Sequence, residues 1–191
     1  MRLFSFVLIA ASMATCCFAI LESFRLVRES QQRIYVLVRG KALEAIATDR
    51  KGNIPVEARD HVKMFHYYFF TLDPDMAVIE RNIGKALYLS GGVARKQYND
   101  LRESGYYARI VSGNVSQRVE VDSILVDTRS YPYRFRYYGK QTIIRSTSLV
   151  KRILVTEGAV REISRSDNNP HGFLIEEWKI LENRNLQVEK R

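Results

Sequence analysis

The chain has 191 residues, of which 46% are hydrophobic and 27% charged, a composition typical of a globular protein and not of a disordered one. Its net charge of +9 suits anionic lipid headgroups, nucleic acid or an acidic protein surface, and does not choose among these partners. Both cysteines, Cys16 and Cys17, lie in an apolar N-terminal stretch, which excludes a disulfide framework and a thiolate metal site from the rest of the chain.

The apolar stretch spans Leu3–Leu21 and contains nineteen residues without a charge. A helix of this length would extend roughly 28 Å, close to the ~30 Å hydrocarbon core of a bilayer. We therefore expect a single transmembrane anchor over residues 1–21, followed by a juxtamembrane helix or linker over residues 22–33. A cleaved signal peptide is the alternative, because Arg2 supplies a minimal basic start and small residues lie near Ala19. The arginines that follow the stretch would, by the positive-inside bias alone, hold the next domain in the cytoplasm.

Residues 34–191 are expected to form one α+β domain. Its first segment, Ile34–Val38, is a β-rich run that predicts a short strand or an extended connector. The composition of Ala42–Ala47 favours a helix, and Asp49–Asn53 has the composition of a loop.

Three helices are expected next. The first begins at Pro55 and carries an apolar stripe at three- and four-residue steps, made of Ala58, Val62, Phe65, Phe69 and Leu72. The second starts at Asp73–Pro74, with Asp73 as its N-cap, and ends at Gly91–Gly92. The third extends over Val93–Ser104 and stops at Gly105.

Four long strands follow, over Val115–Asp127, Tyr131–Thr147, Leu149–Ile163 and Phe173–Leu181. In Tyr131–Tyr138 aromatic residues alternate with arginines, so the aromatic rings are expected to face the core and the arginines the solvent. The alternatives for this stretch are stacking on single-stranded nucleic acid and a protein-binding face. In the last strand the apolar phase shifts, which predicts a bulge at Glu176–Glu177. Helices first and long strands afterwards indicate an α+β fold with the helices on one face of an antiparallel sheet.

The sequence contains few residues in patterns typical of a catalytic, metal-binding or phosphate-binding site. His61 and His66 lie five positions apart on the first expected helix and do not share a face as a metal-binding pair would, so they are expected to be structural or surface histidines. His171 lies in a turn with no evident serine or cysteine nucleophile, and Gly91–Gly92 lacks the spacing of a phosphate-binding loop. We therefore expect no catalytic residue, no metal site, no cofactor and no enzymatic activity.

The loop Ser166–Gly172 precedes the last strand, and its asparagine, proline and glycine residues are typical of a tight turn. Beyond this local pattern, the sequence resembles the TraK family of conjugative transposons in Bacteroides and relatives. The matching stretches are distributed in order over nearly the whole domain: Ile34–Leu37, Ala58–Val62, Phe65–His66, Phe69–Leu72, Gly105–Tyr107, Val121–Ser123, Ser130–Arg134, Ser166–Phe173 and Glu182–Asn183.

The TraK family is related to the bitopic inner-membrane assembly factor of type IV secretion systems. The resemblance implies a nuclear transport factor 2-like cone, in which a curved antiparallel sheet is packed by about three helices. It also implies a structural subunit of a conjugative transfer complex, held in the bacterial inner membrane by residues 3–21 with its C-terminal domain in the periplasm. Such a subunit would act in DNA transfer through self-association and contacts with other transfer-channel subunits, without binding nucleic acid directly.

In those assembly factors an Asn-Pro-x-Gly turn is tied to self-association and partner contacts. Carried onto this sequence, the motif assigns an interaction site to Asn169, Pro170 and Gly172. Family members also carry a cytoplasmic tail before the span, whereas only two residues precede the apolar stretch here. Contacts made through that tail are therefore not carried over.

Two other functions stay open. A cone fold can hold a pocket between its sheet and its helices, and some cone folds catalyse reactions. A periplasmic enzyme would need a convergent acid–base pair, for which the candidates are Asp122, Asp127, Glu157 and Glu177. A module that binds a small ligand or a lipid is the third possibility. A deep polar pocket with perturbed carboxylates would favour the enzyme, and a shallow or filled cone would favour the structural subunit.

Overall fold

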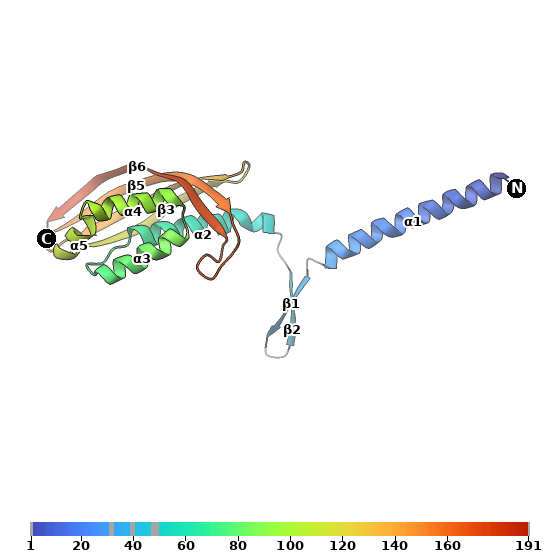
Figure 1. Ribbon diagram of the computed structural model, residues 1–191, viewed down its shortest axis with the longest axis horizontal. Coiled ribbons are helices and arrows are strands. Elements are labelled where there is room, and N and C mark those ends of the chain that lie inside the picture. The colour runs from blue at the N-terminus through green and yellow to red at the C-terminus, as the bar shows by residue number, and fades with distance from the viewer. Residues whose placement is uncertain (1, 31–32, 39–40, 47–49, 191) are drawn as a thin grey trace. The chain divides into compact units, whose positions relative to one another are not determined.

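The computed structural model describes the backbone of residues 2–30, 33–38, 41–46 and 50–190, and the side chains of residues 4, 11–25 and 53–190. The chain divides into two compact units, residues 1–53 and residues 54–191 (Figure 1).

The first unit contains helix α1 (Arg2–Ser30) and the strands β1 (Arg33–Val38) and β2 (Lys41–Ile46). Helix α1 confirms the helix expected for the N-terminal stretch and continues through most of the juxtamembrane segment. In the part of the chain that the structure describes, no helix is long and apolar enough to cross a lipid bilayer. Residues 3 and 5–10 of the expected anchor lie outside the described side chains.

Strand β2 contradicts the expected helix at Ala42–Ala47. It pairs with β1 in an antiparallel hairpin that sets Val36 opposite Leu43. A segment this short does not nucleate a helix by propensity alone, whereas a neighbouring strand supplies partners for its backbone groups. The loop expected at Asp49–Asn53 is also wrong from Arg50 onwards, because the next helix begins there; residues 47–49 lie outside the described residues.

The second unit packs helices along one face of an antiparallel sheet (Figure 1). Its elements are α2 (Arg50–Phe70), α3 (Met76–Tyr88), α4 (Gly92–Glu103), α5 (Tyr106–Ser112), β3 (Ser116–Asp127), β4 (Tyr133–Ile144), β5 (Ser148–Glu162) and β6 (Phe173–Lys190). The strands pair in the order β3-β4-β5-β6, each antiparallel to its neighbour. This arrangement confirms the expected α+β class, in which helices cover one side of an antiparallel sheet.

The helix boundaries differ from the sequence prediction. Pro55, which was expected at the start of α2, lies inside this helix, because the helix begins at Arg50. Asp75, and not Asp73, caps α3: its carboxylate accepts from the backbone N–H groups of Ala77 (2.8 Å) and Val78 (3.3 Å). Asp73 instead forms an ion pair with Arg118 of β3. The short helix α5 is not among the expected elements; it begins directly after Gly105, the residue that is expected to end the preceding helix.

The sheet confirms the predicted alternation in β4. Phe135 and Tyr137 are 3% and 1% exposed and face the helices, whereas Arg134 and Arg136 are exposed. Strand β6 extends to Lys190, well past its expected end. The predicted bulge is confirmed by a register shift in the β5–β6 pairing, with one residue in the left-handed region, Glu177 at φ +52°.

The core forms where α2 lies against the sheet. The predicted stripe of α2 is buried, with Ala58, Val62 and Phe65 having no exposed surface. Phe65 and Phe69 meet the ring of Trp178 edge to face, at centroid distances of 5.0 and 4.9 Å. Such aromatic contacts add to the free energy gained by burying apolar surface.

His66 lies inside this core, and both of its ring nitrogens form hydrogen bonds. Its Nδ1 donates to the carbonyl oxygen of Val62 (2.7 Å), so its Nε2 carries no proton and accepts from the hydroxyl of Thr156 (2.6 Å). Its ring stacks on Tyr137 with a centroid distance of 3.8 Å. Burial lowers the pKa of His66 to about 3.

His61 is buried one turn earlier on α2. Its Nε2 donates to the carbonyl oxygen of Leu89 (3.0 Å), and its Nδ1 is buried without a hydrogen-bond partner among the described residues. Burial lowers the pKa of His61 to about 4. Both histidines are therefore neutral structural groups, as the sequence predicts.

Acidification should destabilise the domain through these two histidines. Both stay neutral in the folded state and take up a proton on unfolding below pH 6.5, so their contribution is complete above pH 6.5 and falls as the pH drops towards 4 and 3. Between pH 6.5 and pH 5, protonation of each histidine in the unfolded state should lower the free energy of unfolding by about 2 kcal/mol. Urea unfolding of the full chain at pH 7 and pH 5 measures the loss.

His66→Gln should show about half of the wild-type pH dependence, since one of the two groups is removed. Tyr137→Phe is the matched control, because it changes the ring stacked on His66 without changing a group that titrates between pH 5 and pH 7. An unfolding free energy of the wild type that is the same at pH 7 and pH 5 would contradict the neutral, buried state of both groups.

Candidate functional site

The Asn-Pro-x-Gly motif forms a closed turn between β5 and β6. Ser166 and Asn169 exchange two backbone hydrogen bonds, of 3.1 and 2.9 Å, and the N–H of Ile163 donates to the carbonyl oxygen of Gly172 (2.8 Å). Gly172 adopts φ +68°, and a side chain there would place its Cβ 2.8 Å from the carbonyl oxygen of Ile163. Glycine is therefore required at this position both by its backbone conformation and by lack of space.

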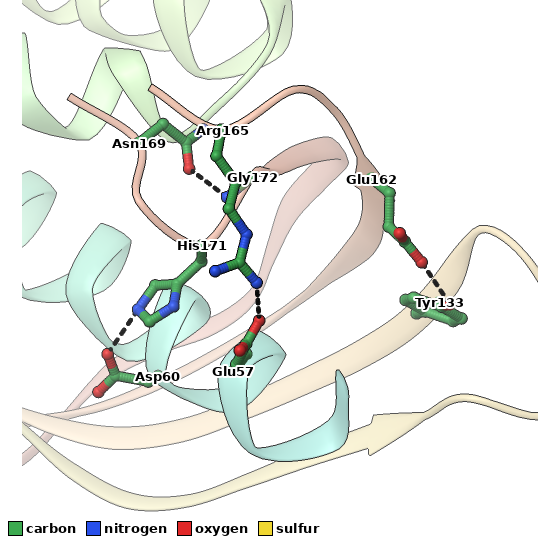
Figure 2. A network of polar contacts seen from close by, with 8 residues as sticks. All are labelled: Glu57, Asp60, Tyr133, Glu162, Arg165, Asn169, His171 and Gly172. Carbon is green, nitrogen blue, oxygen red and sulfur yellow. Dashed lines mark hydrogen bonds and ion pairs between the residues drawn. The ribbon is translucent and has the colours of Figure 1, made fainter. Parts of the chain in front are cut away.

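Asn169 holds the turn against the rest of the domain. Its side chain is 3% exposed, and its amide nitrogen donates to the carbonyl oxygens of Phe173 (2.6 Å) and Tyr88 (3.3 Å). Its Oδ1 accepts from the N–H of Gly172 at 3.2 Å (Figure 2). Of the three predicted site residues, Asn169 and Gly172 thus build the turn, and Pro170 alone is exposed.

An ion pair and a hydrogen bond fasten the turn to helix α2. Arg165 contacts Glu57 at 2.8 Å, and Nε2 of His171 lies 2.9 Å from the carboxylate of Asp60 (Figure 2). Sequence reasoning missed both carboxylates, because they lie more than a hundred positions from their partners and no local pattern marks such a pair. Exposed pairs of this kind contribute little to stability, but they orient the turn relative to α2.

A cavity of about 270 Å³ lies beside the turn, between α2 and the end of α3. Pro170, His171 and Asn168 form its wall on the side of the turn. Tyr68 and Lys85 line the opposite side, with the Lys85 ammonium 5.2 Å from the centre of the Tyr68 ring. We call this region, formed by Pro170, Asn168, Tyr68 and Lys85, the turn surface. Its proline, aromatic ring and cation are suited to contact with another protein chain.

The carboxylates considered for an enzyme are all paired with cations. Asp122 pairs with Lys140 (3.0 Å), and the remaining pairs are Asp127 with Arg129, Glu157 with both Arg136 and Lys179, and Glu177 with Arg134. Hydrogen bonds from Arg129 lower the pKa of Asp127 to about 2, and those from Lys179 and Arg136 lower the pKa of Glu157. These two groups are therefore fixed in the ionised form, whereas a general acid needs a raised pKa.

Three of these carboxylates, Asp127, Glu157 and Glu177, line an open groove of about 580 Å³ that also includes Arg134 and Arg136. These arginines belong to the side of β4 that faces away from the helices, so the groove lies outside the cone and not within it. Within the residues that the structure describes, no group of three or more histidine, cysteine or acidic side chains is placed to hold a metal ion.

The second unit is a four-stranded antiparallel sheet covered on one face by helices, and it shares the VirB8-like form of the nuclear transport factor 2-like fold. No protein-family model and no curated protein matches the sequence.

Solved structures do match. The soluble domain of TrwG of the type IV secretion machinery of Bartonella grahamii has a TM-score of 0.56 at 16% identity, over 69% of this chain and 96% of that one. Agrobacterium tumefaciens VirB8 has a TM-score of 0.53 at 11% identity, over 71% of this chain and 92% of that one. An IcmL-like type IV secretion system protein of Legionella pneumophila has a TM-score of 0.50 at 9% identity, over 73% and 95%. At these identities the likeness establishes a shared fold.

Replacing Asn169 with alanine should destabilise the domain by about 2–4 kcal/mol, because it removes three hydrogen bonds, of which those with Phe173 and Gly172 are buried. Chemical unfolding of the full chain measures the loss. Asn168→Ala is the control, since this neighbouring asparagine is exposed, and it should change stability by less than about 0.5 kcal/mol. Equal effects of the two substitutions would show that Asn169 does not hold the turn.

Proposed function

We propose that the chain is a structural, non-enzymatic subunit of a type IV secretion complex that transfers DNA in conjugation. The observation that supports this most directly is the fold, which the chain shares with components of secretion machines from three bacteria. The resemblance to the TraK family points to a conjugative transposon as the element that is transferred.

The subunit acts through contacts with copies of itself and with other transfer-channel subunits, and the turn surface is the proposed site of these contacts. Its support is structural: the turn is held by the buried Asn169 and by an ion pair and a hydrogen bond to α2, and it presents Pro170 outwards. A preformed surface loses little conformational entropy on association. The roles proposed for Asn169 and Gly172 are therefore to position Pro170, and not to touch the partner.

Residues 3–21 anchor the chain in the bacterial inner membrane in this proposal, with the folded domain in the periplasm. The support is the uncharged sequence of that stretch and the resemblance to bitopic assembly factors. The membrane then confines the subunits to two dimensions and raises their effective concentration, so that weak contacts at the turn surface suffice for assembly.

A charged side chain in place of the exposed Pro170 tests the proposed interaction site. Pro170→Glu should lower both self-association and mating frequency at least about tenfold, because it introduces a desolvated charge at the contact. Crosslinking of the full chain in membranes and a mating assay with a gene-deletion strain measure the two effects. The crosslinks would also identify the partner subunits.

Leu125→Glu is the matched control, since this exposed leucine of β3 lies on the outer groove and not on the turn surface. It should leave transfer unchanged, and both variants should retain the wild-type melting temperature. If Pro170→Glu is folded and transfers DNA at the wild-type frequency, the turn surface is not the interaction site.

The structural subunit and the enzyme differ in what they predict when the paired carboxylates are neutralised. Asp127→Asn removes one ion pair and Glu157→Gln removes two, all of them at the protein surface, so mating frequency should stay within about threefold of the wild type. A general acid or base would lose about a hundredfold or more on the same substitution. A loss of that size in a folded variant would favour a catalytic role.

A further inference from the structure

Strand β3 forms one edge of the sheet: it pairs with β4, and no described strand pairs with its other side. The segment that follows α2 covers only the start of that side. There Leu72 and Gln117 exchange two backbone hydrogen bonds, of 3.0 and 2.8 Å, and Asp73 forms an ion pair with Arg118. Leu72 thus takes the position of a neighbouring antiparallel strand, but for a single residue.

The direction of the next backbone groups of β3 follows from this pair. The N–H and C=O of Gln117 face Leu72 and therefore point away from β4. The pairing of β3 with β4 is regular from Ser116 to Val121. Because backbone groups alternate in direction along an antiparallel strand, those of Val119 and Val121 point the same way as those of Gln117. Neither valine has a backbone partner on this side within the part of the chain that the structure describes. We call Val119–Val121 the open edge.

A groove of about 490 Å³ lies between α2 and the open edge. Met64 and Tyr67 of α2 and the two valines of β3 give it an apolar lining. Tyr67 is 48% exposed and Val121 is 39% exposed, so large apolar side chains are left uncovered there. In a strand added to the open edge every second side chain would enter this groove. Free backbone groups beside an apolar groove are what strand addition by an extended polypeptide segment requires.

The opposite edge of the sheet, β6, is protected against such an addition. Its pairing with β5 contains three register shifts, whereas the pairing of β3 contains one, which lies beyond Val121. Exposed charged side chains also follow one another along β6, among them Glu177, Lys179 and Arg184. Bulges and charges are common means by which an edge strand avoids a partner. The two edges therefore differ, and the open edge of β3 is the one suited to bind a strand.

The charge beside the open edge defines its occupant further. Glu120 lies between the two valines and is exposed. Its cross-strand neighbour Lys140 bonds to Asp122 (3.0 Å), and Glu120 has no ion-pair partner among the described residues. A cationic side chain opposite Glu120 in an added strand would form a cross-strand pair. A second copy does not supply this cation, because full antiparallel pairing of two open edges sets Glu120 of one copy opposite Glu120 of the other.

We propose that the open edge binds an extended segment of another protein as an added strand. The backbone of this segment bonds to Val119 and Val121, its apolar side chains at every second position enter the groove beside Tyr67, and a lysine or arginine between them pairs with Glu120. In this mode of recognition the main-chain hydrogen bonds supply affinity and the alternate side chains supply specificity. The site shares no residue with the turn surface, and its test uses no mating assay, so it is independent of the function proposed above.

Selection of displayed random peptides of about nine residues on the purified full chain tests the proposal, since this length covers a strand. The enriched peptides should carry apolar side chains at every second position and a lysine or arginine between two of them. Synthetic copies should bind Val121→Pro at least about tenfold more weakly than the wild type, because proline removes the outward N–H and its ring blocks the added strand. Glu120→Gln should weaken binding about threefold, as one exposed ion pair is lost.

Val121→Thr is the matched control, because it keeps the branched shape and the backbone N–H, and it should change peptide affinity by less than about threefold. Both variants at this position should retain the wild-type melting temperature, since the N–H of Val121 does not bond to β4. If Val121→Pro does not fold, amide hydrogen exchange of the wild type decides the question: added peptide should slow exchange at Val119 and Val121 at least about tenfold.

No enriched peptide, enriched peptides without the alternation, equal binding to Val121→Pro, or unchanged exchange at the two valine amides would overturn the proposal. Slow exchange of both amides in the chain alone, accompanied by dimer formation, would overturn it as well and assign the open edge to a second copy.

Discussion

The contact between helix α2 and the sheet is the interaction on which the rest of the domain depends. At its centre His66 stacks on Tyr137 and bonds to Thr156, so a polar ring from the helix is joined to two neighbouring strands. Around it, phenylalanines of the same helix meet Trp178. His66 is neutral, and both of its ring nitrogens form hydrogen bonds. It therefore packs against the sheet and orients α2 without the free-energy cost of a buried charge.

Helix α2 also positions two regions of the domain: the turn surface, and the cavity that lies between α2, α4, α5 and the sheet. Its N-terminal half provides Glu57 and Asp60, which hold the turn, while Tyr68 and His61 line the cavity beside it. The end of the same helix supplies Phe69 and Phe70, which line a cavity of about 170 Å³. A shift of α2 along the sheet would therefore alter the two regions together, so their geometries are coupled through one rigid element.

Local patterns in the sequence predicted much of this architecture, because they report on periodicity and burial. The α2 stripe, the alternation in β4 and the bulge of β6 all follow from side chains that must face one core. The predictions that were wrong concern segments whose structure depends on contacts with another part of the chain. Lys41–Ile46 becomes a strand because another strand lies beside it, and Asp75 replaces Asp73 as the cap because Arg118 engages the latter. The site was assigned by resemblance, and only the structure separates the exposed Pro170 from the buried Asn169 that holds it.

The bulge at Glu177 fixes the spacing along β6. Phe173 and Ile175 point inwards before it, and Trp178 points inwards after it, which a regular strand would not allow. One residue added or lost between Gly172 and Trp178 would therefore turn the tryptophan towards solvent and disconnect α2 from the last strand. We therefore expect insertions and deletions to be tolerated only in the exposed first half of this corner, around Asp167 and Asn168, and the number of residues from Gly172 to Trp178 to stay constant.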